Sequence, residues 1–375
     1  MKKLILAAAT LCSSVTYAAS NVVVVTIDGL RWQEVFSGAD SKLIEHKDFV
    51  KDPALLKQAF WDENAQMRRE KLMPFLWQTI AKQGVVVGNR ELGSKMSVAN
   101  EWYFSYPGYN EILTGQADPD IDSNALENNK NVTFLEWLNN KPEYGQKLAA
   151  FGSWDAFPYI FNEQRSGLYV NATFDSYHIQ PQSAEMTLLN ELQAQTPSPW
   201  QNVRTDSFTY RFAKDYLTHI QPKAMVISLG ETDDFAHEGH YDRYLHATKR
   251  TDAYLEDLWR TIQSTPGYRN NTTLLIVTDH GRGYNADDWQ HHASKKAVSG
   301  YMKKLSHFQQ GIIGADEIWM AAIGPDIKPL GELKAHKEFK QDQIAATALT
   351  ILGENPQQFN PQAGKAIKEI IKLWI

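Results

Sequence analysis

The residues most suited to hold metal ions lie in three segments. Two of them have an aspartate directly after an apolar run, and the third pairs an aspartate with a histidine. Asp28 follows a run of β-branched residues, and Asp279 and His280 follow another apolar run. Asp233 and His237 are four positions apart, so on one helical turn their side chains face the same point. Carboxylates and imidazoles are ligands that Zn²⁺ accepts. Taken singly, each of these segments is also what an ordinary polar turn contains.

A serine at the entrance of a short helix is the candidate nucleophile. Ser105 lies two residues before Pro107, the segment 110–114 is predicted to be helical, and Gly115 is a typical helix end. Serine before a helix is most often a simple cap. The positive end of the helix dipole would nevertheless favour an alkoxide or a phosphate there.

Two adjacent histidines, His291 and His292, follow the Asp279 segment in a polar loop. A metal site that lacks one imidazole makes one of them a candidate ligand. Neighbouring residues in an extended loop point to opposite sides, so we expect only one of the pair to reach an ion.

Together these residues predict two metal sites around one serine. Two divalent cations about 4 Å apart can activate such a serine and stabilise a leaving group. The first predicted ligand set is Asp28, Ser105, Asp279 and His280, and the second is Asp233, His237 and His292.

The pattern of apolar runs predicts a doubly wound α/β fold with a mostly parallel central sheet flanked by helices. In such sheets ligands bind beyond the carboxyl ends of the strands, where Asp28, Asp233 and Asp279 fall. The segment 35–65 is polar and predicted to be irregular. The predicted strands are 21–27, 85–87, 148–151, 224–229, 273–278 and 318–323. The predicted helices are 73–82, 110–114, 132–139, 184–195, 207–220, 241–263 and 341–352.

Residues 1–18 are predicted to be a signal peptide, because a basic start, a short apolar run and small residues follow one another. The expected location is therefore periplasmic or secreted. The single cysteine, Cys12, would leave with this segment. Removal of residues 1–18 takes two lysines from a chain whose net charge is −6. The resulting acidic charge argues against a surface that binds along nucleic acid. After residue 18 the sequence contains no run of about 18 apolar residues, so no membrane span is predicted.

Residues 19–375 are predicted to form a single catalytic domain, in which 153–205 is a small capping insertion. The insertion is rich in aromatic residues that could stack on a substrate or could form a small core of their own. These aromatic residues are Trp154, Phe157, Tyr159, Phe161 and Tyr169.

The chain resembles the alkaline phosphatase superfamily, and within it the branch of nucleotide pyrophosphatase/phosphodiesterase-like enzymes. The resemblance covers about 28–325 and rests on five segments in the same order. They are the strand ending in Asp28, the segment from Ser105 to Gly115, the Asp233-x-x-x-His237 element, Asp279-His280-Gly281 and the late His292.

The resemblance implies a phosphoryl hydrolase that acts on a small phosphoester, with two Zn²⁺ ions and a phospho-serine intermediate on Ser105. It favours His292 over His291, because in similar sequences the late ligand follows a tryptophan by three positions, as His292 follows Trp289. Gly108 stands where that branch has an asparagine that contacts phosphate, which leaves the choice between monoester and diester open. Asn110 and Arg282 are the candidates for that substrate contact.

Two alternatives are a sulfatase on the same fold and a catalytically silent metal-binding member. Sulfatases of the superfamily carry proline two residues and arginine four residues after the nucleophile. Pro107 fits this pattern, but Tyr109 stands where the arginine is needed. The complete set of predicted ligands argues against a silent member.

Overall fold

The computed structural model describes residues 21–335 and 337–372. The predicted signal peptide lies outside these residues. Eight strands form the central sheet in the order β10-β2-β9-β7-β1-β6-β4-β5, and three short strands form a second sheet in the order β11-β3-β8. The strands of the central sheet are β1 (Asn21–Ile27), β2 (Val85–Val87), β4 (Leu148–Gly152), β5 (Tyr169–Ala172), β6 (Ala224–Leu229), β7 (Thr272–Val277), β9 (Met320–Ile323) and β10 (Gly331–Glu332). The second sheet contains β3 (Met96–Ser97), β8 (Glu317–Ile318) and β11 (Phe339–Lys340).

Strand β1 lies near the middle of the central sheet, and its sequence explains why. All seven residues are buried, as expected for a β-branched run covered on both faces. β1 pairs in parallel with β6 on one side and with β7 on the other. The carboxyl ends of these three strands therefore lie side by side, with that of β1 between the other two.

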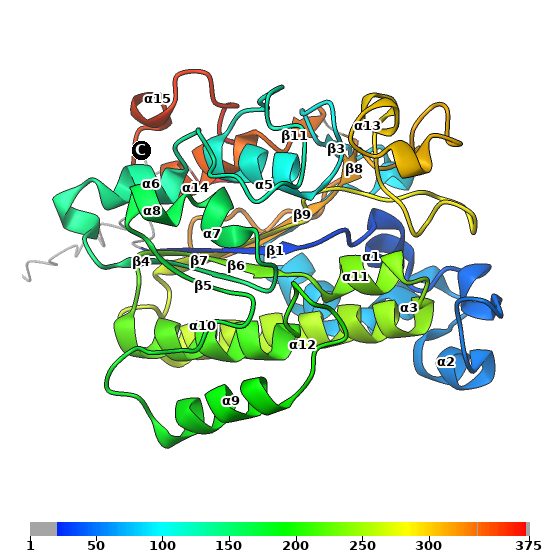
Figure 1. Ribbon diagram of the computed structural model, residues 1–375, viewed down its shortest axis with the longest axis horizontal. Helices are drawn as coiled ribbons and strands as arrows, with labels where there is room; N and C mark the ends of the chain where they lie inside the picture. Colours follow the sequence, from blue (N-terminus) through cyan, green and yellow to red (C-terminus); the bar gives the residue numbers. More distant parts are fainter. Residues whose placement is uncertain (1–20, 336, 373–375) are drawn as a thin grey trace, which may run out of the picture.

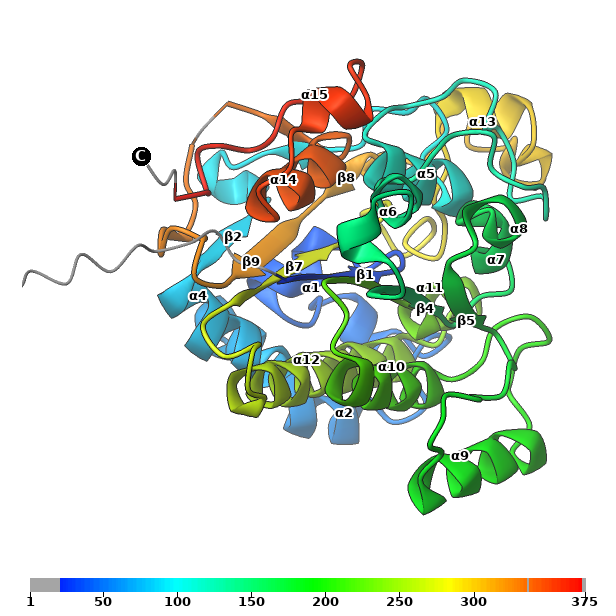
Figure 2. The same cartoon turned by 90° about the vertical axis from the view of Figure 1, so that its left-hand side faces the viewer.

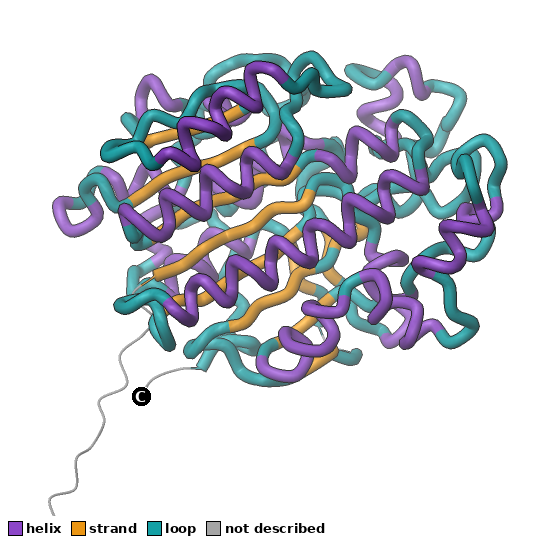
Figure 3. The backbone as a smooth tube through the Cα atoms, turned by 90° about the horizontal axis from the view of Figure 1, so that it is seen from below, coloured by secondary structure: helices purple, strands orange, loops and turns teal. Residues whose placement is uncertain are grey.

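Helices cover both faces of the sheet (Figure 1). The long amphipathic helices α10 (Asp206–Ile220) and α12 (Tyr241–Ser264) lie on one face, and Figure 3 shows this face from below, with helices lying over the strands. Helices α5 (Ser105–Thr114), α6 (Phe134–Asn139) and α14 (Gln343–Ile351) cover the other face (Figure 2). The predicted α/β fold with a large central sheet flanked by helices is confirmed.

The remaining helices are short. The α-helices are α1 (Trp32–Ser37), α2 (Pro53–Phe60), α3 (Ala65–Leu72), α4 (Ala81–Gln83), α7 (Phe157–Ile160), α8 (Glu163–Ser166), α9 (Ala184–Gln195), α11 (Glu231–His237), α13 (Lys295–Ser299) and α15 (Pro356–Phe359). Tighter or wider helical turns are η1 (Leu43–Glu45), η2 (Leu76–Ile80), η3 (Arg90–Leu92), η4 (Pro142–Tyr144) and η5 (Lys303–Leu305).

Three details of the predicted elements were wrong. The segment 35–65 is not irregular, because it contains the end of α1, the turn η1 and the whole of α2. The predicted strand 318–323 is divided into β8 and β9, and β9 runs antiparallel to its neighbours β7 and β2. Helix α5 begins at Ser105 itself, and its first turn already includes Pro107.

The segment 153–205 has two parts with different positions. Strand β5 extends the central sheet by pairing with β4, whereas α9 lies outside the α10–α12 layer (Figures 1 and 2). Among the aromatic residues singled out in this segment, Phe157 and Phe161 belong to the core, and Trp154 lines a cleft described below. Within residues 21–335 and 337–372, no helix is both long and apolar enough to cross a membrane.

Candidate active site

The carboxyl end of β1 places Asp28 between the ends of β6 and β7. One carboxylate oxygen of Asp28, Oδ2, accepts a hydrogen bond from the Tyr109 hydroxyl at 2.9 Å. At the end of β7, Oδ1 of Asp279 accepts the backbone N–H of Gly29 at 3.0 Å. The other oxygens, Asp28 Oδ1 and Asp279 Oδ2, are buried and have no hydrogen-bond partner. A buried carboxylate oxygen without a donor is costly, so a positive ligand is expected there.

His280 faces both of these oxygens. Its Nε2 atom lies 3.3 Å from Asp28 Oδ1 and 3.5 Å from Asp279 Oδ2. The other ring nitrogen, Nδ1, lies 3.0 Å from the carbonyl oxygen of Gly281. A carbonyl oxygen only accepts, so Nδ1 carries a proton, and in the neutral ring Nε2 has a free lone pair.

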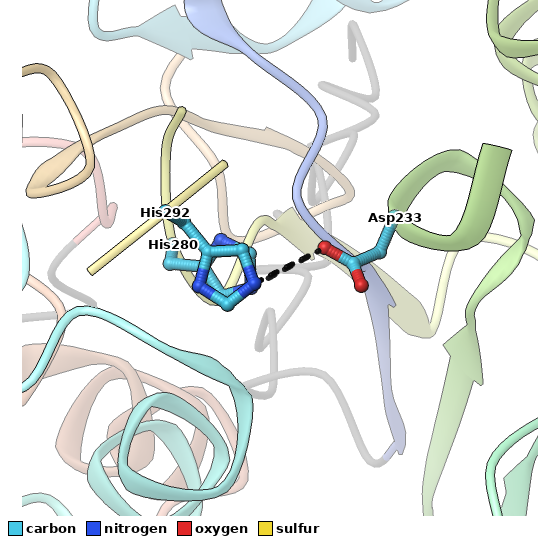
Figure 4. Close-up of side chains that lie close together, drawn as sticks. All are labelled: Asp233, His280 and His292. Atoms are coloured by element: carbon cyan, nitrogen blue, oxygen red, sulfur yellow. Dashed lines mark ion pairs between the residues drawn. The ribbon is translucent and has the colours of Figure 1, made fainter. Parts of the chain in front are cut away.

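A second group of ligands lies next to the first. His292 Nε2 is 3.7 Å from Asp233 Oδ1, and His237 Nε2 is 3.1 Å from Asp233 Oδ2 and 3.1 Å from His292 Nε2. His280 Nε2 is also 3.6 Å from Asp233 Oδ1. Figure 4 shows Asp233 facing the imidazoles of His280 and His292, whose rings stack with centroids 3.7 Å apart.

The donor chemistry of this cluster fits metal ions. His292 Nδ1 lies 3.1 Å from the carbonyl oxygen of Tyr103, so its Nε2 also has a free lone pair in the neutral ring. Nitrogen lone pairs thus face carboxylate oxygens. Both groups are electron-rich, so a proton or a cation between them is needed for attraction. Two groups have ligand atoms close enough to share an ion, namely Asp28 with Asp279 and His280, and Asp233 with His280 and His292. Mixed nitrogen and oxygen ligands of this kind suit Zn²⁺.

Burial and mutual repulsion govern the ionisation of the three carboxyl groups. Burial raises the pKa of Asp28 well above its usual value, and the charge of Asp233 adds to this effect. Burial likewise raises the pKa of Asp279, again with a contribution from Asp28. Burial also acts to raise the pKa of Asp233, but Arg282 and His237 outweigh it and hold that pKa well below its usual value. Cations bound to Asp28 and Asp279 would remove this penalty, so metal binding is expected to release protons.

Ser105 is the first residue of α5, and its Oγ atom lies 3.3 Å from His280 Nε2. Helix α5 approaches the end of β7 very closely at Gly108. A Cβ atom on Gly108 would lie 2.6 Å from the carbonyl oxygen of Asp279. Gly108 therefore lies against the backbone of Asp279, a candidate metal ligand, so the expectation that this position corresponds to a phosphate contact is not supported. The glycine allows the helix to bring Ser105 to the cluster.

The loop before Ser105 also positions His292. The carboxylate of Glu111 accepts the backbone N–H groups of Ala99 and Asn100, at 2.7 Å and 2.8 Å. The Asn100 side chain in turn accepts the N–H of Tyr103, whose backbone has a φ of 58°. This left-handed conformation is uncommon for a non-glycine residue, and the carbonyl of the same residue holds the His292 ring. Burial raises the pKa of Glu111 to about 7.

The two adjacent histidines have different surroundings. His292 is 2 % exposed and lies in the ligand cluster. His291 packs its ring 5.8 Å from the ring of Phe308, outside that cluster. Trp289 fixes this loop, because its buried indole packs against Tyr241 and Tyr244. The structure thus brings His292 to the site and directs His291 away from it.

A cleft of about 380 Å³ opens above the cluster. The residues of the nucleophile and metal segments that line it are Asp28, Ser105, Gly230, Asp233 and His237. Its other lining residues are Asn124, Leu126, Trp154, Asp155, Asn202, Val203, Asp234 and Tyr301. The candidate ligands His280 and His292 are buried below it.

Neither residue predicted to bind substrate reaches this cleft. Asn110 is buried, its Oδ1 atom accepts from Asn129 and Asn131, and its Nδ2 atom donates to Gln116. The guanidinium of Arg282 is buried and donates to the carboxylate of Asp233 and to three backbone carbonyl groups. Arg282 therefore positions Asp233, because its Nη2 group donates to both the carboxylate and the backbone carbonyl of that residue.

Sequence reasoning missed Asn124, which lines the cleft together with Ser105. Its Oδ1 atom accepts the backbone N–H of Tyr106 at 3.0 Å, in the first turn of α5. Among the described residues, nothing accepts a hydrogen bond from its Nδ2 atom. The amide N–H groups are thus free to bind an oxyanion in front of Ser105. Asn124 lies in a stretch of turn-forming residues, and no motif in the sequence distinguishes it.

Comparisons with known proteins identify the family of the chain. A family model described as type I phosphodiesterase / nucleotide pyrophosphatase matches residues 40–360. The chain belongs to this family. The predicted resemblance to the alkaline phosphatase superfamily is thereby confirmed, and the protein is a hydrolase of that superfamily that acts on phosphoester bonds. A search of curated proteins finds no match.

Solved structures of the superfamily share the fold of this type I phosphodiesterase family member. The alkaline phosphatase PafA is 12 % identical over 95 % of this chain and 99 % of its own, with a TM-score of 0.57. A phosphonate monoester hydrolase from Silicibacter pomeroyi is 13 % identical over 93 % of this chain and 76 % of its own, with a TM-score of 0.54. A 2-O GAG sulfatase is 14 % identical over 90 % and 71 %, with a TM-score of 0.53.

Proposed function

We propose that this protein is an exported, two-metal phosphodiesterase whose nucleophile is Ser105. The observation that carries the proposal is the position of Ser105 Oγ, 3.3 Å from His280 Nε2, beside a cluster of three carboxylates and three imidazoles. Export is proposed from the pattern of residues 1–18 alone.

The two groups of ligands would hold two divalent ions, and Zn²⁺ suits their chemistry best. Asp28, Ser105, Asp279 and His280 would hold one ion, and Asp233, His237 and His292 the other. When bound, Zn²⁺ supplies positive charge to the phosphoryl oxygens and favours the ionised form of the serine hydroxyl.

The reaction proceeds in two displacements at phosphorus. Ser105 Oγ forms a bond to phosphorus while the bond to the departing alcohol breaks, and that alcohol takes up a proton. Water then attacks the phospho-serine, which releases the phosphate product and restores the hydroxyl of Ser105. The position of Ser105 at the first residue of α5 favours negative charge on both its oxygen and the phosphoryl group.

The charges around the cleft favour a diester over a monoester. A phosphate monoester carries close to two negative charges at neutral pH, whereas a diester carries one. No lysine or arginine is among the described residues that line the cleft. Arg282, the basic residue paired with Asp233, is buried, makes four hydrogen bonds within the protein and does not line the cleft. The single charge of a diester needs less compensation.

Asn124 supports the proposal as the donor for a phosphoryl oxygen. The backbone N–H of Tyr106 holds its Oδ1 atom. The amide nitrogen is therefore already oriented before the substrate reacts, and no further side-chain entropy is lost during the reaction. A donor that is fixed in advance stabilises charge that develops in the transition state, and loss of such a donor typically costs about 10²–10³ in kcat.

A substrate panel tests this function with the Zn²⁺-loaded protein. The three substrates are a phosphate monoester, a phosphate diester and a sulfate ester, each of p-nitrophenol. They share one leaving group, so differences in kcat/KM report on the transferred group. We expect the diester to have the highest value. Asn124→Ala should lower kcat/KM for the diester by about 10² or more without loss of the fold.

An exposed asparagine that does not line the cleft gives a matched control. Asn128 lies four residues after Asn124 and is exposed, and Asn128→Ala should leave kcat/KM unchanged. A higher kcat/KM for the sulfate ester than for either phosphoester would contradict the proposal. Equal rates for the monoester and the diester would contradict the diester preference.

A further inference from the structure

Glu111 is a fully buried acid of the nucleophile helix that the proposed chemistry does not use. It lies in α5, six residues after Ser105, and it holds the loop that leads into that helix. Its carboxylate accepts the backbone N–H groups of Ala99 and Asn100, and it also accepts the side-chain amide of Asn100 at 2.9 Å. Within the described part of the chain it forms no ion pair with a lysine or an arginine, so these three donors are what stabilise its charge.

A chain of hydrogen bonds leads from Glu111 to the ring of His292. Asn100 donates to Glu111 through Nδ2 and accepts the backbone N–H of Tyr103 through Oδ1, at 3.0 Å. The carbonyl oxygen of Tyr103 lies 3.1 Å from Nδ1 of His292. Because the left-handed backbone of Tyr103 is costly, it persists only where its surroundings fix it. These contacts therefore hold the imidazole with its Nε2 atom toward Asp233.

The same loop runs beside the segment that carries His292. The backbone N–H of Ser294 donates to the carbonyl group of Trp102 at 3.0 Å. The side chains of Trp102 and Phe104 belong to one small apolar cluster with Ala293. Phe104 directly precedes the nucleophile, so a shift of this loop would displace both the start of α5 and the late histidine ligand.

The protonation state of Glu111 determines how many donors it can accept. Burial raises the pKa of Glu111 to about 7, and the charge of Asp342, directly before α14, adds to this effect, although the three N–H donors act in the opposite direction. Lys340 acts on Asp342, and Tyr103 is the other titratable group whose pKa responds to Glu111. Both carboxyl oxygens of Glu111 face N–H donors, so a proton on either oxygen removes an acceptor from the loop.

We infer that Glu111 is a positioning residue whose ionised form holds the Tyr103 loop and, through it, the His292 ligand, so that hydrolysis slows when Glu111 takes up a proton. The inference rests on the proposed function, because it assigns Glu111 to the support of the second group of metal ligands. The ionised form accepts all three donors, so kcat should rise with pH as Glu111 ionises and fall as the pH decreases through about 7.

Glu111→Gln imitates the protonated residue, because a donor replaces one of the two side-chain oxygens. In the full protein saturated with Zn²⁺, we expect kcat for a p-nitrophenyl phosphodiester at about pH 8 to be about tenfold or more below that of the wild type. The fall in kcat that the wild type shows between about pH 8 and pH 6 should be absent from the variant, because position 111 no longer titrates.

Zn²⁺ affinity provides a readout that does not depend on turnover. Titration of the metal-free protein with Zn²⁺ at about pH 8 should show one of two sites weakened by about tenfold or more in Glu111→Gln, and the other site unchanged. Loss of a group that orients a metal ligand typically has an effect of this size, about 10–100-fold in affinity.

Asp252→Asn is the matched control. Asp252 is also buried, burial also raises its pKa to about 7, and its carboxylate accepts the backbone N–H groups of Phe75 and Leu76 at 2.8 Å and 2.9 Å. It lies in α12, on the face of the sheet opposite to α5 (Figure 2). This control loses the same kind of contact as Glu111→Gln, but it should keep the wild-type pH profile and both Zn²⁺ affinities.

Asn100→Ala breaks the same chain of contacts one step further along. It leaves the Glu111 carboxylate in place but removes both the Nδ2 donor and the acceptor for the Tyr103 N–H. It should therefore weaken the same Zn²⁺ site by about tenfold or more. If Glu111→Gln does not fold, this variant decides the question, and unchanged Zn²⁺ affinities in Asn100→Ala would then overturn the inference.

These measurements distinguish a failure of this inference from a failure of the proposed function. A Glu111→Gln protein that keeps the wild-type kcat, pH profile and Zn²⁺ affinities would overturn the inference and leave the phosphodiesterase intact. Equal losses in Glu111→Gln and Asp252→Asn would also overturn it, because they would show a general loss of stability. A wild type that binds Zn²⁺ but hydrolyses no phosphodiester at any pH would overturn the proposed function, and the Zn²⁺ titrations would still test how Glu111 supports the ligands.

Discussion

Replacing Ser105 with alanine is expected to lower kcat for phosphodiester hydrolysis by at least about 10³, with the fold and the imidazole and carboxylate ligands retained. In the proposed mechanism the hydroxyl is both the attacking group and a metal ligand, and its Oγ atom lies 3.3 Å from His280 Nε2. No other serine, threonine or cysteine lines the described part of the cleft. Single-turnover and steady-state rates with a p-nitrophenyl diester would measure the loss.

Two further variants make this result specific. Ser105→Thr keeps a hydroxyl and should retain measurable activity, as expected from similar sequences with threonine at the nucleophile position. Ser166→Ala removes another buried serine, at the end of α8 and outside the site, and should leave kcat unchanged. If Ser105→Ala turned over at close to the wild-type rate, water would attack phosphorus directly and Ser105 would only begin the helix.

The second large effect is expected at the adjacent histidines. His292→Ala should lose one of two bound metal ions and most activity, because its Nε2 atom lies 3.1 Å from His237 Nε2 and 3.7 Å from Asp233 Oδ1. Loss of one imidazole from a mixed site leaves too few ligands to hold an ion tightly. Metal content by elemental analysis and kcat with the same diester would be measured together.

His291→Ala is the matched control for that variant. The ring of His291 packs near Phe308, outside the ligand cluster, so both ions and nearly all activity should remain. The opposite pattern, with His291 required and His292 dispensable, would mean that the loop after Gly283 has a different register, with His291 at the metal site.

The central part of the fold could be predicted because local sequence patterns determine it directly. The β-branched run of β1 is buried on both faces, and the ends of parallel strands must meet at one edge. This rule is enough to place Asp28 and Asp279 at the same edge of the sheet. Asp233 lies one turn beyond β6, at the start of a helix, and follows from the same rule.

Other features depend on contacts between distant segments. The predicted start of α5 is too late, because proline is tolerated anywhere in a first turn, where N–H groups lack helical partners. The antiparallel direction of β9 could not be inferred, since its apolar run is like that of a parallel strand. Asn124 lines the cleft, and the backbone N–H of Tyr106 holds its amide oxygen, a contact that no spacing in the sequence indicates.

The measurement that tests the central claim most directly is the metal content of the purified wild-type protein, determined beside its phosphodiesterase activity. The buried oxygens Asp28 Oδ1 and Asp279 Oδ2 lack donors and face an imidazole lone pair, so a bound cation would stabilise the cluster. We expect close to two Zn²⁺ ions per chain, loss of hydrolysis after chelation, and recovery when Zn²⁺ is returned. Full activity in excess chelator, from protein in which elemental analysis finds no metal, would contradict the account.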